Sequence, residues 1–218
     1  MSSIFMNSLA SAKTCGPGRP KDMEKRAAIL DAAKQLFIGQ GFDNTSMDAI
    51  ASAAGVSKLT VYSHFHDKET LFTEAVRSKC EEQLPAEIFM PDLKGPIRNQ
   101  LLTIARAFFS LVTSEDALAM HRTIVGNSPQ SPKLAQLFWD AGPARVQATF
   151  SAFLRDEVAA RQLDVPDVHR AATQFFCLLK GECHARLEFG CCSQFSQHEI
   201  DEHLNATVDM FLRAYATR

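Results

Sequence analysis

The sequence has no long hydrophobic run. None of its apolar stretches approaches the roughly 18 consecutive residues that a membrane span needs, and the longest, around Phe175 to Leu179, is followed by Lys180 and Glu182. The first dozen residues lack the basic start and sustained apolar core of a secretory leader. Six cysteines are too few for a disulfide scaffold. We therefore expect a soluble protein of a reducing compartment, the cytoplasm.

The chain also lacks a large excess of either charge. Its 218 residues carry 23 Lys and Arg against 25 Asp and Glu, a formal net charge of −2. Binding to a polyanion such as DNA would therefore require a local basic patch. With 46% hydrophobic and 22% charged residues the composition is typical of globular proteins. We expect a folded core, in one large domain or in a small domain joined to a larger one.

Strand signals are nearly absent. No alternating run is flanked by Asn-Gly type turns, and no repeating period indicates a repeat array. Apolar residues recur instead at three- and four-residue spacing, which predicts an all-α fold. The predicted helices cover residues 22–38, 47–54, 58–65, a helix capped by Asp67, 97–112, 117–125, a helix opened by Pro132, 144–161, a long helix closed by Gly190, and a last helix with Ser196 and Glu199 as its capping box.

Motifs for catalysis are missing as well. The sequence contains no phosphate-binding glycine loop, no His-Glu-x-x-His and no Gly-x-Ser-x-Gly. We therefore predict no enzyme activity, no catalytic residues and no cofactor, while an α-helical enzyme with a degenerate DNA-binding motif stays a third possibility.

The densest group of soft metal ligands contains Cys177, Cys183, His184, Cys191, Cys192 and His198. It includes no Cys-x-x-Cys pair, and a six-residue spacing places Cys177 and Cys183 on different faces of a helix. We predict no metal site and mostly buried, inert thiols, with Cys191 and Cys192 exposed in a loop. Redox- or metal-responsive regulation through these cysteines is the alternative hypothesis.

The informative segment runs from Thr45 to Phe72. Thr45 or Ser46 can cap a short helix, Gly55 can adopt the positive φ of a tight turn, and Ser57 can cap the next short helix. Two short helices joined in this way, with a third packed behind them, are typical of a helix-turn-helix, whose second helix enters the major groove of DNA. The polar positions of that second helix offer partners to phosphates and base edges: Lys58, Thr60, Tyr62, Ser63 and His64.

Basic residues flank this segment on both sides. Lys68 begins the following helix, where its ammonium and the free backbone N–H groups both favour a phosphate. Upstream, Gly18-Arg19-Pro20-Lys21 predicts a mobile basic arm over residues 1–20. Arg19 of this arm and Lys21 directly after it can enter a narrow minor groove. The predicted organisation is this arm, a helix-turn-helix domain over 21–68 and a C-terminal domain over 69–218.

The segment resembles the TetR family of bacterial transcriptional regulators. The similarity covers residues 22 to 72 and is carried by Gly55-Val56-Ser57-Lys58-Leu59-Thr60-Val61-Tyr62-Ser63-His64-Phe65 and by Asp67-Lys68-Glu69-Thr70-Leu71-Phe72. One departure is Leu59, where the family often has glycine; a leucine can meet a thymine methyl group or change which bases the helix approaches. The predicted DNA contacts are Arg19, Lys21, Thr45, Ser46, Lys58, Leu59, Thr60, Tyr62, Ser63, His64 and Lys68.

Residues 100 to 160 resemble the AefR-like C-terminal domain of that family. The similarity is carried by His121-Arg122-Thr123-Ile124-Val125, Phe138-Trp139 and Gly142-Pro143-Ala144-Arg145. It implies a homodimer formed largely by the last two long helices, a small-molecule cavity, and a repressor released from a palindromic operator when that cavity is filled. The predicted ligand contacts are Phe108, Met120, His121, Phe138, Trp139 and Phe176, from a set of aromatic and soft residues that also includes Phe109 and Phe175 and that plain core packing would equally explain.

Overall fold

The computed structural model describes residues 19–90 and 95–217, with side chains from residue 23 onward. Within these ranges the chain is helical, and its only β-type pairing is an isolated bridge between Leu163 and Ala216. The all-α prediction is confirmed. None of the described helices is both long and apolar enough to cross a membrane.

The first helices are α1 (Arg19–Asn44), α2 (Met47–Ala53), α3 (Lys58–His64) and α4 (Lys68–Gln83). Helix α1 extends past its predicted end at residue 38, with non-helical backbone angles at Gly41, whereas α2, α3 and α4 follow their local signals closely. The side chains of Ser46, Ser57 and Asp67 cap α2, α3 and α4 by accepting hydrogen bonds from backbone N–H groups three residues later. Gly55, between α2 and α3, has a φ of 66°, as the predicted turn requires.

The remaining elements lie near their predicted ranges. They are a 3₁₀ turn η1 (Ala86–Phe89), α5 (Ile97–Thr113), α6 (Glu115–Asn127), α7 (Pro132–Ala141), α8 (Pro143–Ala159), α9 (Val168–Glu188) and α10 (Gln197–Tyr215). Pro132 opens α7, and Ser196 with Glu199 forms the expected capping box on α10. The turn η1 was not expected from the sequence, because Pro85 and Pro91 indicated a loop there.

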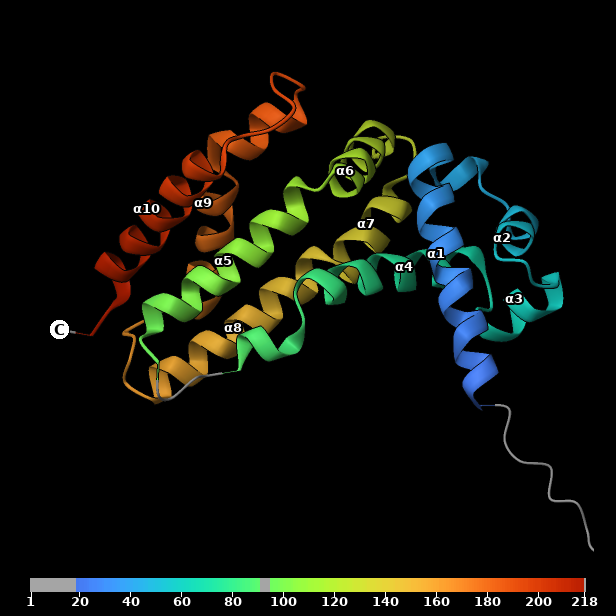
Figure 1. Ribbon diagram of the computed structural model, residues 1–218. Coiled ribbons are helices and arrows are strands. Elements are labelled where there is room, and N and C mark those ends of the chain that lie inside the picture. The colour runs from blue at the N-terminus through green and yellow to red at the C-terminus, as the bar shows by residue number, and fades with distance from the viewer. Residues whose placement is uncertain (1–18, 91–94, 218) are drawn as a thin grey trace, which may run out of the picture.

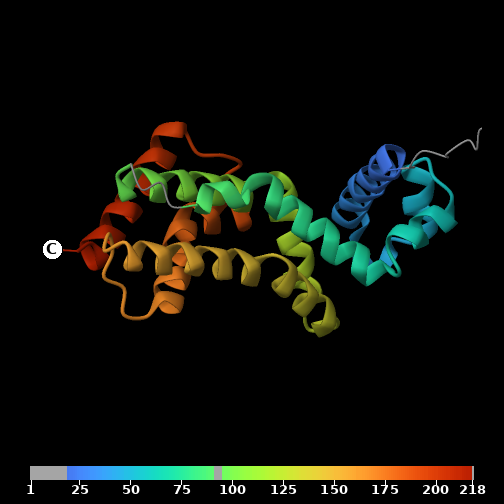
Figure 2. The same cartoon turned by 90° about the horizontal axis from the view of Figure 1, so that it is seen from below.

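The helices pack around two hydrophobic cores. One lies among α5, α8, α9 and α10 and contains Phe150, Phe175 and Phe211. The other is built by α1 to α4 together with Ile124 of α6 and Leu134 of α7. The molecule is elongated, with α2 and α3 at one end and the C-terminus at the other (Figure 1), and α4 leads from the first group towards the second (Figure 2).

Helix α9 is broken at Gly181, although its sequence pattern predicted an uninterrupted helix. Gly181 has φ 46° and ψ −150°, a conformation that is essentially restricted to glycine. His203 of α10 inserts at this point, and its Nε2 donates a hydrogen bond to the carbonyl oxygen of Leu179 at 2.8 Å. A side chain from a neighbouring helix thus satisfies a carbonyl group at the break in the backbone ladder.

Candidate functional site

Helix α3 presents a mixed face to solvent. Val61 is completely buried and Phe65, just beyond the helix, is 1% exposed, so both belong to the core as predicted from the sequence. Lys58, Leu59, Tyr62 and Ser63 lie on the exposed side. Leu59 is 79% exposed, which leaves its methyl groups accessible to a base edge.

The ammonium of Lys58 is paired before any DNA is present. Its Nζ lies 2.8 Å from Oδ1 of Asp48 on α2, and this hydrogen bond raises the pKa of Lys58. A phosphate contact therefore requires Lys58 to exchange Asp48 for the phosphate or to bridge both. Sequence analysis did not identify this pair, because an acidic residue in the first turn of a helix is already favoured by the helix dipole.

Lys68 is also engaged within the protein. Its Nζ donates a hydrogen bond to the carbonyl oxygen of Phe42 at 2.8 Å and lies 4.3 Å from the centre of the Phe42 ring. The lysine therefore connects the start of α4 to the C-terminal end of α1. It remains half-buried beside Lys58 and Tyr62, in a shallow hollow that Asp43, Asp48 and Asp67 also line.

The side-chain hydroxyl groups that were predicted to contact DNA differ in their exposure to solvent. Thr45 is 1% exposed, and its Oγ1 donates to the carbonyl oxygen of Gly41 at 2.7 Å. The predicted DNA contact by the Thr45 side chain is therefore wrong, because this group is buried and hydrogen-bonded inside the protein. Ser46 is the exposed cap of α2, the Oγ1 of Thr60 lies 2.8 Å from Ser57 Oγ, and Ser63 donates to the Thr60 carbonyl. Half-buried His64 packs against Phe65.

The basic arm is only partly represented in the structure. Residues 1–18 lie outside the described residues, and the side chains of Arg19 and Lys21 are not described, although both residues belong to the first turn of α1. The helix therefore begins three residues before the predicted start at Asp22. Nearby Arg26 is committed to the fold, since its guanidinium pairs with Glu74 at 2.6 Å and lies over the Phe65 ring.

A cavity of about 520 Å³ lies between the two cores. Its walls come from α1 and from each of α4 to α9. All six predicted ligand residues line it: Phe108, Met120, His121, Phe138, Trp139 and Phe176. Phe109 and Phe175 belong to the same core as Phe108 and Phe176 but do not line the cavity. Sequence analysis missed Phe37 on α1 and Phe72 on α4, because apolar residues at helical spacing are equally explained by core packing.

Polar groups gather at the end of the cavity formed by α6 and α9. Nδ1 of His121 lies 2.9 Å from Oε1 of Glu188, while the other carboxylate oxygen of Glu188 is buried without a hydrogen-bond partner. Burial lowers the pKa of His184 to about 4, and the nearby ammonium of Lys180 adds to this effect. His184 is therefore neutral at pH 7 and can both donate and accept a hydrogen bond.

The cysteines are less uniformly buried than expected. Cys177 and Cys191 are exposed and Cys192 is half-buried, so the prediction of buried thiols is wrong for Cys177. The expected exposure of Cys191 is confirmed. Cys80 and Cys177 both line the cavity, and burial raises the pKa of Cys80 to about 11, which makes its thiol a poor nucleophile at neutral pH. Among the described residues, no three His, Cys, Asp or Glu side chains are placed to hold a metal ion.

Aromatic rings connect the cavity with the α3 end of the molecule. Phe37 and Phe72 line the cavity, and their ring centroids lie 5.7 and 5.3 Å from that of Phe42. The ammonium group of Lys68 lies over the face of the Phe42 ring. A displacement of the cavity wall can therefore reach Lys68 through directly packed side chains.

The chain is similar to known regulators along its length. Residues 29–75 match the family described as bacterial regulatory proteins, tetR family, and residues 99–217 match the AefR-like transcriptional repressor, C-terminal domain. The HTH-type transcriptional regulator YdeS of Bacillus subtilis is 30% identical over 133 residues, 60% of this chain and 64% of that protein.

Solved structures extend this similarity to the whole fold. The flavonoid-responsive regulator FrrA is 35% identical with a TM-score of 0.72, over 90% of this chain and 99% of that one. A TetR-family transcriptional regulator from Mesorhizobium loti is 28% identical with a TM-score of 0.74, over 91% of this chain and 100% of that one. The chain therefore belongs to the TetR family of transcriptional regulators and carries an AefR-like C-terminal domain.

Proposed function

We propose that the protein is a ligand-responsive transcriptional repressor, which binds a palindromic operator as a homodimer in the cytoplasm and leaves it when a small molecule fills the cavity. The observation that carries this proposal is the composition of the cavity wall. Phe37 and Phe72 come from helices α1 and α4, which also support α2 and α3. A bound molecule therefore contacts the helices that hold the DNA-reading surface in place.

Repression and release are supported by the relatives. The C-terminal family is described as that of AefR-like repressors, and FrrA responds to flavonoids. Two recognition helices related by a two-fold axis reach successive major grooves when they are about 34–36 Å apart. A ligand that favours another spacing needs a coupling of only about 1–3 kcal/mol to weaken operator binding by about 5- to 150-fold.

The proposed dimer face lies on the outer sides of α9 and α10. The apolar stripe of α10 does not provide it, because Leu204, Val208 and Phe211 are buried in the core of their own chain. Exposed apolar side chains remain at Leu178 and Phe189 near α9 and at Met210 on α10. A dimer formed through the outer sides of α9 and α10, which lie away from α3 in Figure 1, would leave both recognition helices free to face DNA.

The test is selection of duplexes from a random-sequence pool, followed by anisotropy titration of the enriched sequence at several salt concentrations. We expect a two-fold symmetric sequence, two chains bound per duplex by sedimentation, and a steep fall of affinity with salt. Equal, weak binding of the selected and unselected duplexes would contradict sequence-specific regulation. Two chains bound to an asymmetric sequence would contradict the palindromic operator.

The redox- or metal-responsive alternative is not supported by the described residues. They contain no group of three metal ligands, and burial raises the pKa of Cys183, one of the cysteines of that hypothesis, which disfavours its thiolate. We therefore propose no second function.

A further inference from the structure

We propose that the cavity binds an aromatic weak acid in its anionic form, with the rings among the Phe and Trp side chains and the acid group at Lys180. This inference rests on the proposed ligand response and specifies its ligand class. Nothing in the matched families or in the names of the relatives assigns this charge.

The walls favour flat, apolar rings. Phe108 and Phe176 lie with ring centroids 4.3 Å apart on one side, and Phe138 with Trp139 contributes from α7. Trp139 is half-exposed, so its indole presents a surface that the protein itself does not cover. A volume of about 520 Å³ is typical of sites for small organic molecules and accommodates a compound of two or three rings.

The three lysines that line the cavity differ in their partners. Its lining includes three lysines and a single carboxylate, that of Asp116. Lys34 pairs with Glu82 of α4, and Lys79 pairs with Asp116 at 2.9 Å. Lys180, by contrast, has no carboxylate within ion-pairing distance among the described residues.

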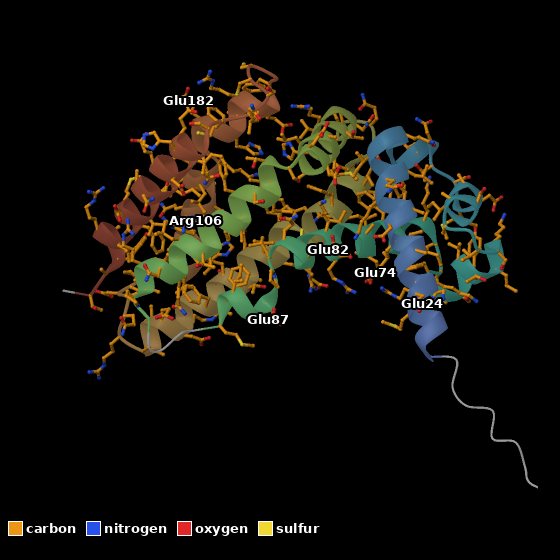
Figure 3. The ribbon with its side chains drawn as sticks, viewed as in Figure 1. Glu24, Glu74, Glu82, Glu87, Arg106 and Glu182 are labelled. Carbon is orange, nitrogen blue, oxygen red and sulfur yellow. The ribbon has the colours of Figure 1, made fainter. Side chains whose placement is uncertain are left out.

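The acidic residue nearest to Lys180 in sequence does not compensate its charge. Glu182 projects from the edge of the molecule (Figure 3), is 81% exposed, and pairs with Arg186 at 3.7 Å. Lys180 is half-buried beside apolar rings, where an unpaired ammonium is less stable than one with a counter-ion. A ligand carboxylate or phenolate would supply the missing partner.

One imidazole can add a donor to the site for an acid group. His184 feels the charge of the Lys180 ammonium, is neutral, and offers one donor. His121 adds no second donor, because its Nδ1 lies 2.9 Å from Glu188 and Nε2 of the neutral ring is then an acceptor. An anion at Lys180 can thus bind two nitrogen donors, whereas a neutral ring compound would leave the lysine without a counter-ion.

Calorimetric titration of the full-length protein with matched pairs of compounds tests this inference. The probes are naphthalene-2-, biphenyl-4- and anthracene-2-carboxylate, each compared with its neutral carboxamide. We expect at least one carboxylate to bind about 10-fold or more tightly than its amide. In Lys180→Met this carboxylate should lose about 10- to 100-fold in affinity, while the amide is unaffected. Lys25→Met, which removes an exposed lysine of α1, is the matched control and should bind like the wild type.

The outcomes separate this inference from the proposed function. Equal binding of acid and amide, an unchanged preference in Lys180→Met, or no binding by any of the acids would overturn the ligand class. If a carboxylate binds as expected and operator affinity does not change, the ligand class stands and the proposed release mechanism fails. If only amides release the operator, the mechanism stands and the ligand class fails.

Discussion

At the scale of single residues, the α3 surface is occupied by its own contacts in the DNA-free protein. Lys58 pairs with Asp48, Lys68 bonds to the Phe42 carbonyl, and Ser63 bonds to the carbonyl of Thr60. A DNA contact by any of these three side chains would therefore replace an existing interaction or share it. The net gain per contact is smaller than the residue types suggest, because the exchanged groups are already satisfied.

The Lys58–Asp48 pair provides a test of this exchange. Asp48→Asn should strengthen operator binding by about 3- to 10-fold, because it frees Lys58 and removes a negative charge from the surface. Lys58→Met should weaken binding and reduce the slope of log affinity against log salt by about 0.9, the loss of one phosphate contact.

The double variant distinguishes release of Lys58 from simple repulsion of DNA by Asp48. If Lys58 is the group released, Asp48→Asn should give a smaller gain in a Lys58→Met background. Anisotropy titrations of the four proteins measure this cycle. An equal gain in both backgrounds would mean that Asp48 acts only by repulsion.

His184 predicts a pH dependence of stability. Its pKa is about 4 in the folded protein against 6.5 ordinarily, chiefly through burial, with Lys180 and His121 adding to the shift and Glu188 opposing it. Because the unfolded chain binds the proton first, the contribution is complete above about pH 6.5 and is lost as the pH falls towards 4. We expect the free energy of unfolding to fall by about 2 kcal/mol between pH 7.5 and 5 from this residue.

Urea unfolding of the wild type and His184→Gln at both pH values measures this contribution. The variant should lose about 2 kcal/mol less than the wild type over the same interval. The same loss in both proteins would show that His184 is accessible to protons in the folded state.

At the scale of elements, most helices follow their sequence patterns, and α9 departs from its pattern through a contact with another helix. The capping residues and first-turn prolines that start a helix interact only with residues of the same turn. The helix starts can therefore be predicted from the local sequence. The break at Gly181 depends on His203, which lies on the next helix and has no local relation to α9. It also separates Lys180 from the last turns of α9, where His184 and Glu188 lie.

Gly181→Ala should destabilise the protein by about 2–3 kcal/mol. Alanine is strained at φ 46°, and its Cβ would lie 2.9 Å from Cε1 of His203. Gly126→Ala in α6 is the matched control, because its Cβ would meet nothing within 4 Å, and we expect it to be neutral or stabilising by up to about 1 kcal/mol. Urea unfolding provides the comparison, and an equal effect of the two substitutions would show that the break tolerates a side chain.

At the scale of the whole molecule, the cavity lies between the two hydrophobic cores, and residues of both cores line its wall. Residue 68, the predicted end of the DNA-binding domain, is followed by Leu71 and Phe72, which are buried in the same core as Ile29 and Val61. Figure 3 shows Glu74 and Glu82 along α4, and these residues pair with Arg26 and Lys34 of α1. Helix α4 is therefore common to the DNA end and the cavity.

The ring contacts of Phe42 predict where the two sites communicate. Phe42→Leu should leave operator affinity without ligand within about threefold, since the core packing is largely kept. The loss of affinity caused by a saturating ligand should become about threefold smaller or less, because leucine cannot keep both ring contacts and the contact with Lys68. Anisotropy titrations with and without the ligand measure this coupling.

Phe195→Leu serves as a control for the loss of a ring, since Phe195 contacts Arg186 away from this path. A full ligand response in Phe42→Leu, equal to that of Phe195→Leu, would mean that the coupling takes another route.

The sequence by itself determined most of the helices, their caps and the exposed face of α3. These features depend on side-chain periodicity and on hydrogen bonds within one turn, both of which are local. The tertiary structure decided which of these groups are available: it buried Thr45, paired Lys58 with Asp48, used the apolar stripe of α10 inside its own chain, and placed Phe37 and Phe72 in the cavity wall. Such pairings join residues distant in sequence, and their geometry exists only once the helices have packed.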